Sequence, residues 1–114
     1  MNAVDRFWDA RCTQNWESLG AQLRAGVSIS MVHEDAELSR DEYFTFLRVM
    51  HQDADTKITR IVGGRSMQFA VLAEIRRAKA TFECAGFYAL REGRIELIEE
   101  LWLSRGTGRL FDLI

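Results

Sequence analysis

Three glutamates lie inside apolar runs near the C-terminal end of the chain. Glu83 interrupts the run from 81 to 90, and Glu99 and Glu100 interrupt the run from 94 to 103. Successive side chains of a strand point to opposite faces, so Glu99 and Glu100 must face opposite ways. A carboxylate that is removed from water has a raised pKa and can act as a general acid or base. Glu83 and Glu100 are therefore candidate catalytic residues.

The glutamates also have a plainer interpretation, which the sequence alone leaves open. On a solvent-facing side of the sheet they would pair across strands with Arg76, Arg77 or Arg94. Each such pair adds roughly 0.2–1 kcal/mol to stability and needs no further function.

The second group of candidates is the stretch His33-Glu34-Asp35, which follows an alternating run from 27 to 32. His33 and Asp35 at a strand exit could assist an acid from the last strands as a proton shuttle. His33 and His51 lack the close spacing of metal ligands, so no metal site and no cofactor are predicted. His51 closes a predicted helix, where a cation interacts favourably with the helix dipole.

Aromatic residues dominate the remaining candidates. They could line a pocket for a flat apolar molecule, although core packing explains them equally well. The candidate pocket residues are Phe7, Trp8, Trp16, Tyr43, Leu47, Tyr88 and Trp102.

Composition excludes several classes of function. The 114 residues are 47% hydrophobic with a formal charge of −2, which predicts one folded domain over 1–114. Acidic and basic residues are mixed, so a nucleic-acid partner is not expected. No stretch approaches the roughly 18 apolar residues of a membrane helix, which predicts a cytoplasmic protein without a membrane partner. Cys12 and Cys84 are expected to be reduced thiols.

The spacing of apolar residues changes along the chain, from every third or fourth residue to every second residue. Helical spacing covers residues 2–24, with Thr13 as a cap between two helices and Gly26 as the end of the helical region. Ser39 to Glu42 form a capping box that opens a helix to about residue 51. Strands are predicted over 57–62, 67–76, 81–90 and 94–103. The predicted fold is α+β, with two to three N-terminal helices on a strongly curved antiparallel sheet that encloses a conical cavity.

The hairpin FYALREGRIELIEELW, residues 87–102, resembles the last hairpin of the nuclear transport factor 2-like superfamily. The order of the motifs is also similar, from an aromatic first helix through Ser39-Arg40-Asp41-Glu42 to the strands. Arg91-Glu92 replaces the commoner turn acids, and Leu101-Trp102 replaces Tyr-Trp. The resemblance implies the cone-shaped, cystatin-like roll of the SnoaL-like and ketosteroid-isomerase-like proteins.

The resemblance does not imply a steroid isomerase. In those enzymes a tyrosine and a protonated carboxyl stabilise the oxyanion, and aligned by motif these positions fall on Phe7 and near Gly86, neither of which can donate. The base position falls near residues 30–33, where only His33, Glu34 or Asp35 could substitute. Whether the chain is an enzyme is left open.

Two functions remain from the sequence. One is a pocket protein with acid–base chemistry on a small apolar carbonyl or cyclic molecule. The other is a non-catalytic binding or assembly module, a homodimer through the outer sheet face, as the resemblance implies. Apolar area for that face would come from Ala70, Leu72 and Ile75 or from Phe82, Cys84 and Tyr88. The apolar residues 110–114 are expected to pack on the sheet or on a partner, so that their deletion would lower stability or dissociate the dimer.

Overall fold

Each of the three helices begins after a residue whose side chain accepts a hydrogen bond from a free backbone N–H group of the first turn. The computed structural model describes residues 1–105. Asn2 caps α1 (Ala3–Thr13), and Asn15 caps α2 (Trp16–Ala21). The predicted capping box of α3 (Arg40–His51) is confirmed, since the Glu42 N–H donates to Ser39 Oγ at 3.1 Å and the Ser39 N–H donates to Glu42 Oε1 at 2.8 Å.

The first helical region is shorter than its apolar spacing indicates. A helix does end at Thr13, but β1 (Leu23–Met31) begins two residues after α2 ends, so Gly26 lies inside this strand and does not end a helix. The prediction for Gly26 was wrong because Leu23 continues the helical spacing of apolar residues although its side chain is buried from a strand. A 3₁₀ turn (Val32–Glu34) then leads to the short β2 (Ala36–Leu38).

The four strands that follow α3 form the predicted meander. They are β3 (Asp55–Gly63), β4 (Gln68–Arg76), β5 (Thr81–Arg91) and β6 (Arg94–Arg105), each antiparallel to the next. A 3₁₀ turn (Arg65–Met67) joins β3 to β4. Between β5 and β6, Glu92 and Gly93 have φ of 52° and 81°, the positive values that a tight two-residue hairpin turn needs.

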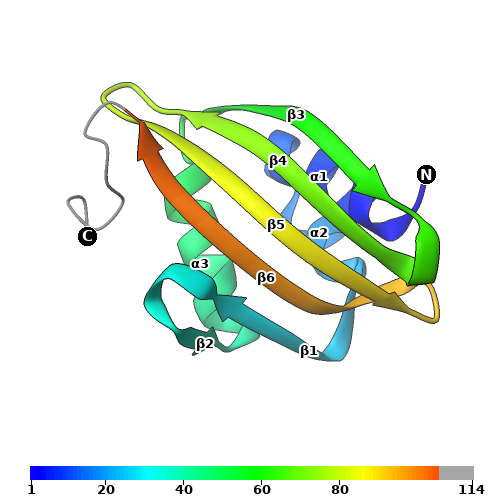
Figure 1. Cartoon of the computed structure of the whole chain (residues 1–114). Coiled ribbons are helices and arrows are strands. Elements are labelled where there is room, and N and C mark those ends of the chain that lie inside the picture. The colour runs from blue at the N-terminus through cyan, green and yellow to red at the C-terminus, as the bar shows by residue number, and fades with distance from the viewer. Residues whose placement is uncertain (106–114) are drawn as a thin grey trace.

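The six strands form one sheet in the order β2-β1-β6-β5-β4-β3. The pairing of β1 with β6 is parallel, so the expectation of an entirely antiparallel sheet was wrong. Parallel neighbours need a long crossover, and here the chain passes through α3 and the four strands β2, β3, β4 and β5 before β6 pairs with β1. In Figure 1 the helices lie behind the curved sheet, as expected for this α+β fold.

The face of the sheet toward the helices forms the core. Alternation along β5 and β6 buries Cys84, Tyr88, Ile98, Glu100 and Trp102 on this face. Both cysteines are free thiols.

Two further expectations concern a membrane-spanning helix and the C-terminal residues 110–114. Within residues 1–105 no helix is both long and apolar enough to span a bilayer. The expectation for residues 110–114 lies outside the described residues.

Candidate functional site

The centre of the site is the Glu100 carboxylate, which β6 places on the helix-facing side of the sheet. Its Oε2 accepts hydrogen bonds from Arg11 Nη1 at 2.6 Å, Tyr43 Oη at 2.7 Å and Tyr88 Oη at 2.7 Å. Its Oε1 accepts one from Trp102 Nε1 at 3.0 Å. A carboxylate oxygen has about two lone-pair sites, so Oε2 is saturated and Oε1 can accept one more hydrogen bond.

The donors come from four elements that converge on this carboxylate. Arg11 extends inward from α1, Tyr43 from α3, Tyr88 from β5 and Trp102 from β6 itself. All four side chains and Glu100 are almost completely buried, with at most 1% of their surface exposed. The network therefore lies out of contact with water, where hydrogen bonds to a charge are strong.

Opposing effects set the charges of the network. Burial acts to raise the pKa of Glu100, but Arg11 and the two tyrosine hydroxyls lower it below its usual value. Burial acts to lower the pKa of Arg11, and the Glu100 carboxylate raises it well above its usual range. Burial and the Glu100 charge raise the pKa values of Tyr43 and Tyr88. At neutral pH the site therefore holds one carboxylate, one guanidinium and two neutral phenols.

His51 binds a further nitrogen of the Arg11 guanidinium, Nε. Arg11 Nε donates to His51 Nε2 at 3.3 Å, which assigns the ring proton to Nδ1, and Nδ1 lies 2.9 Å from Thr56 Oγ1. Burial and the neighbouring guanidinium lower the pKa of His51 to about 3. The imidazole is therefore neutral, and the expectation of a cation on the helix dipole was wrong because His51 is buried.

Gly86 makes room for Tyr88. A Cβ built on Gly86 would lie 2.1 Å from Tyr88 Oη and 2.5 Å from the carbon that carries this oxygen. The ring of Tyr88 therefore folds back along β5 over Gly86. The resemblance placed an acid near this position, and in the structure the Tyr88 hydroxyl occupies the space of the absent side chain.

The other candidate catalytic residues lie outside this network. Glu83 lies on the outer face of the sheet, where Arg105 Nη2 donates to its Oε1 at 2.5 Å, which matches the cross-strand alternative with a different arginine. His33 lies in the 3₁₀ turn after β1, with its Nε2 3.6 Å from Glu34 Oε1. Asp35 lines a surface hollow of about 240 Å³ together with Ser30 and Glu37. Of the four candidates only Glu100 joins the buried network.

The candidate pocket residues pack against one another. Phe7 stacks parallel to Tyr43, with ring centroids 6.5 Å apart, and lies 5.7 Å from Tyr88. Trp16 is half-buried beside His51 at 6.4 Å. These side chains surround the hydrogen-bond network of Glu100. The remaining members, Trp8, Leu47 and Trp102, are buried to 1% exposure or less.

Sequence reasoning missed Arg11 and assigned His51 to the helix dipole, although periodicity gives a signal for the burial of both. Arg11 lies four residues after Phe7 and three after Trp8, on the apolar stripe of α1. His51 lies four residues after Leu47 on the inward stripe of α3. A polar residue at an apolar position of a helix predicts burial, and a buried charge must have a partner.

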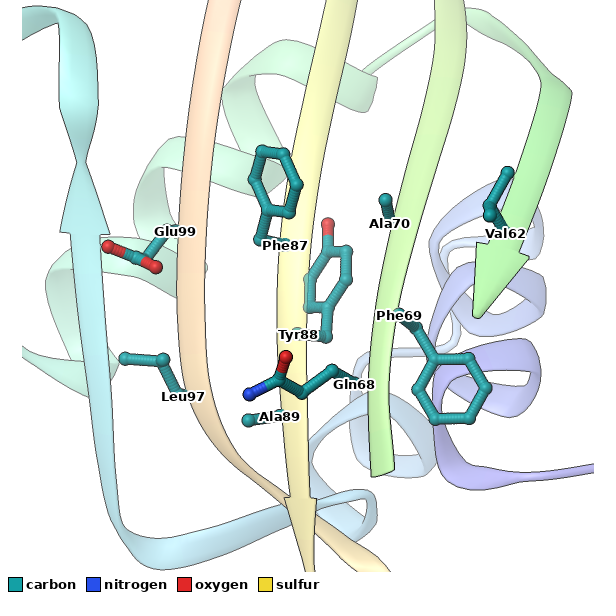
Figure 2. A pocket seen from close by; sticks show the side chains of 9 residues that line it. All are labelled: Val62, Gln68, Phe69, Ala70, Phe87, Tyr88, Ala89, Leu97 and Glu99. Atoms are coloured by element: carbon teal, nitrogen blue, oxygen red, sulfur yellow. The ribbon is translucent and has the colours of Figure 1, made fainter. Parts of the chain in front are cut away.

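The outer face of the sheet carries a second feature, an apolar groove of about 320 Å³. Figure 2 shows Val62, Ala70, Phe87 and Leu97 on four adjacent strands, with the helices on the far side of the sheet. Phe87 is 58% exposed. Phe82, Cys84 and Tyr88 face inward instead, as does Ile75, so their assignment to an outer interface was wrong. Ala70 and Leu72 do lie on the outer side.

Within residues 1–105 no group of three or more histidine, cysteine, aspartate or glutamate side chains converges as a metal site would require.

Comparison with known proteins identifies the fold. No family model and no curated protein matches the sequence. Solved structures do match. A nuclear transport factor 2-like protein of unknown function from Burkholderia xenovorans LB400 superposes with a TM-score of 0.78 at 10% identity, over 97% of this chain and 88% of that chain.

Two further matches have names that state an activity. A proposed ketosteroid isomerase from Kribbella flavida DSM 17836 gives a TM-score of 0.77 at 17% identity, over 88% of this chain and 74% of that one. An LEH-like epoxide hydrolase of M. tuberculosis gives a TM-score of 0.67 at 20% identity, over 88% of this chain and 79% of that one. The chain therefore has the fold of the nuclear transport factor 2-like superfamily.

Proposed function

We propose that this protein binds a small, mostly apolar molecule that carries an oxygen, and that Glu100 acts on this molecule as a general base. The observation that carries the proposal is the convergence of Arg11, Tyr43 and Tyr88 on one oxygen of a buried carboxylate. Their hydrogen bonds leave Oε1 as the oxygen with remaining capacity.

The cost of burying this network argues for a role beyond packing. Replacing a buried ion pair with apolar residues of similar volume is often neutral or stabilising. Arg11 and Glu100 are both completely buried, so apolar side chains could fill the same space without desolvation of two charges. Ionisable groups with shifted pKa values are concentrated at functional sites.

We infer separate roles for the members of the site from their geometry. Arg11 and the two tyrosines hold Glu100 in its ionised form through Oε2, while Oε1 would accept a proton from the ligand or from a water molecule. Phe7 and Trp8 would supply apolar contact area. The names of the structural relatives, an isomerase of ketosteroids and an epoxide hydrolase, suggest two reaction classes: proton removal beside a carbonyl and addition of water to an epoxide.

Both reactions can be followed by proton NMR with simple probes. Acetophenone in D₂O reports proton removal through loss of its methyl signal, and styrene oxide reports water addition through formation of the diol. We expect the wild type to accelerate at least one reaction and Glu100→Gln to reduce the rate by about 10²-fold or more, as for loss of a general base. Glu99→Gln is the matched control on the opposite face and should retain the rate. If the wild type accelerates neither reaction and neither probe raises its melting temperature, the proposal is wrong.

The outer groove supports a second candidate function, assembly of two copies through the sheet. Val62 and Phe87 are each more than half exposed, and Leu72 adds apolar area beside them. Two copies that cover this face would remove it from water. We expect sedimentation of the wild type at twice the 13.1 kDa of one chain and of Phe87→Ser at that of a monomer. Val49→Ser, at an equally exposed residue of α3, is the control. A monomeric wild type would exclude this function.

A further inference from the structure

Two buried N–H donors, one on Arg11 and one on the Trp8 ring that it contacts, have no hydrogen-bond acceptor among the described residues. Within residues 1–105, Arg11 Nη2 and Trp8 Nε1 are both inaccessible to solvent and unpartnered. A buried donor without an acceptor costs about 1–3 kcal/mol, and native structures contain few of them.

The two donors belong to side chains that lie against each other. The guanidinium carbon of Arg11 lies 3.7 Å from the centroid of the Trp8 ring. The other guanidinium nitrogens of Arg11 are occupied, Nε by His51 and Nη1 by Glu100 and Tyr43. Nη2 is thus the one nitrogen of this group that is available to a further acceptor.

The charges around the donors restrict what the acceptor can be. Arg11 and Glu100 cancel each other. The remaining titratable groups that face them are Tyr43, Tyr88, His51 and Cys84, and all are neutral at pH 7, since burial raises the pKa of the Cys84 thiol as well. A ligand anion would add an uncompensated charge to a site without water, which is costly. A carbonyl oxygen accepts two hydrogen bonds and brings no charge.

We propose that Arg11 Nη2 and Trp8 Nε1 form the subsite that binds the carbonyl oxygen of a neutral, mostly apolar ligand. The inference rests on the proposed function and specifies its ligand class. With the oxygen held by these donors, the carbon beside the carbonyl would be presented to Glu100 Oε1. The aromatic rings around the site must move for the ligand to enter, because every side chain here is buried.

The indole N–H signals of ¹⁵N-labelled protein test this subsite directly. The chain has three tryptophans, and Trp→Phe variants at positions 8, 16 and 102 assign the three signals. Titration with acetophenone should move the Trp8 indole proton downfield and leave that of Trp16 in place. Ethylbenzene, which has a similar shape without the oxygen, should not cause this shift, and benzoate should bind more weakly than acetophenone.

A second measurement distinguishes the effect of the Trp8 N–H donor on binding from the effect of the shape of the indole ring. Replacing Trp8 with benzothienylalanine retains the bicyclic ring but removes the N–H, and it should weaken acetophenone binding by about tenfold, the loss of one hydrogen bond. Unchanged affinity would overturn the subsite.

The outcomes distinguish the subsite from the proposed function. If acetophenone binds or loses its methyl protons in a Glu100-dependent way while the Trp8 signal stays fixed, the subsite is wrong and the function stands. A Trp8 indole proton that shows a cross-peak to water at saturating acetophenone also overturns the subsite, because the donor is then hydrated. If acetophenone binds nowhere, the subsite is wrong, and the proposed function fails with it only if styrene oxide also neither reacts nor raises the melting temperature.

Discussion

A methyl group added at Gly86 should displace Tyr88 from Glu100. Gly86 lies inside β5 and has no positive φ, so alanine is acceptable to the backbone and the effect comes from the clash alone. The added Cβ would lie 2.1 to 2.7 Å from three atoms of the Tyr88 phenol, distances at which the ring must move. Movement breaks the 2.7 Å hydrogen bond between Tyr88 and Glu100.

The expected loss of stability has two parts. A hydrogen bond to a charged group contributes about 1.5–3 kcal/mol, and overpacking of a core costs about 1–3 kcal/mol. Because the contributions overlap, Gly86→Ala should lower the free energy of unfolding by about 2–5 kcal/mol. The assay is urea unfolding followed by far-UV circular dichroism.

Two comparisons separate the effect of the clash between residue 86 and Tyr88 from the other effects of the substitution. Gly26→Ala is the matched control, since a Cβ there meets nothing within 4 Å, and it should change stability by less than about 0.5 kcal/mol. In a Tyr88→Ala background, Gly86→Ala should cost close to nothing. A loss below about 0.5 kcal/mol in the wild-type background, or an equal loss in both backgrounds, would refute the reasoning.

Three further predictions concern the network and the helix that supports it. Glu100→Gln should lower the free energy of unfolding by about 3–5 kcal/mol because it leaves Arg11 charged and buried, whereas Glu99→Gln should change it by less than about 0.5 kcal/mol. Since the pKa of His51 falls from 6.5 to about 3 on folding, the unfolded state binds more protons between these values, and stability should fall as pH drops. The His51 contribution lost between pH 8 and pH 5 is about 2 kcal/mol, measured as urea midpoints, and His51→Gln should abolish this part of the slope; an unchanged slope would contradict it. Ser39→Ala removes the cap of α3 and should cost about 1 kcal/mol in thermal unfolding, and no change would show that the cap is dispensable.

Local rules predicted much of the fold from the sequence. Alternation placed Glu99 and Glu100 on opposite faces, the capping box located the start of α3, and Arg91-Glu92-Gly93 marked the last turn. The parallel pairing of β1 with β6 was not predictable in this way, because strand periodicity indicates which face a side chain takes and does not indicate which strand is its neighbour.

The candidate site was predictable in part. Strand alternation identified Glu100 as one of two glutamates that could point inward, but not its partners, because Arg11 is 89 residues away in sequence. Tyr88 was placed in the candidate pocket as an aromatic side chain. That its hydroxyl fills the space above Gly86 depends on the rotamer of the ring, which the sequence pattern does not specify.

The separation of Arg11 and Glu100 in sequence also determines when the ion pair can form. Arg11 belongs to the first helix and Glu100 to the last described strand, so the contact requires closure of nearly the whole chain. Contacts between residues so far apart in the sequence are expected to form after the local hairpins during folding. A folding intermediate that has the β3–β6 meander but has not docked α1 would hold Glu100 without its cation, and the carboxylate would then take up a proton more readily. We therefore expect the ion pair to form late in folding, so that a mutation that weakens it should mainly accelerate unfolding.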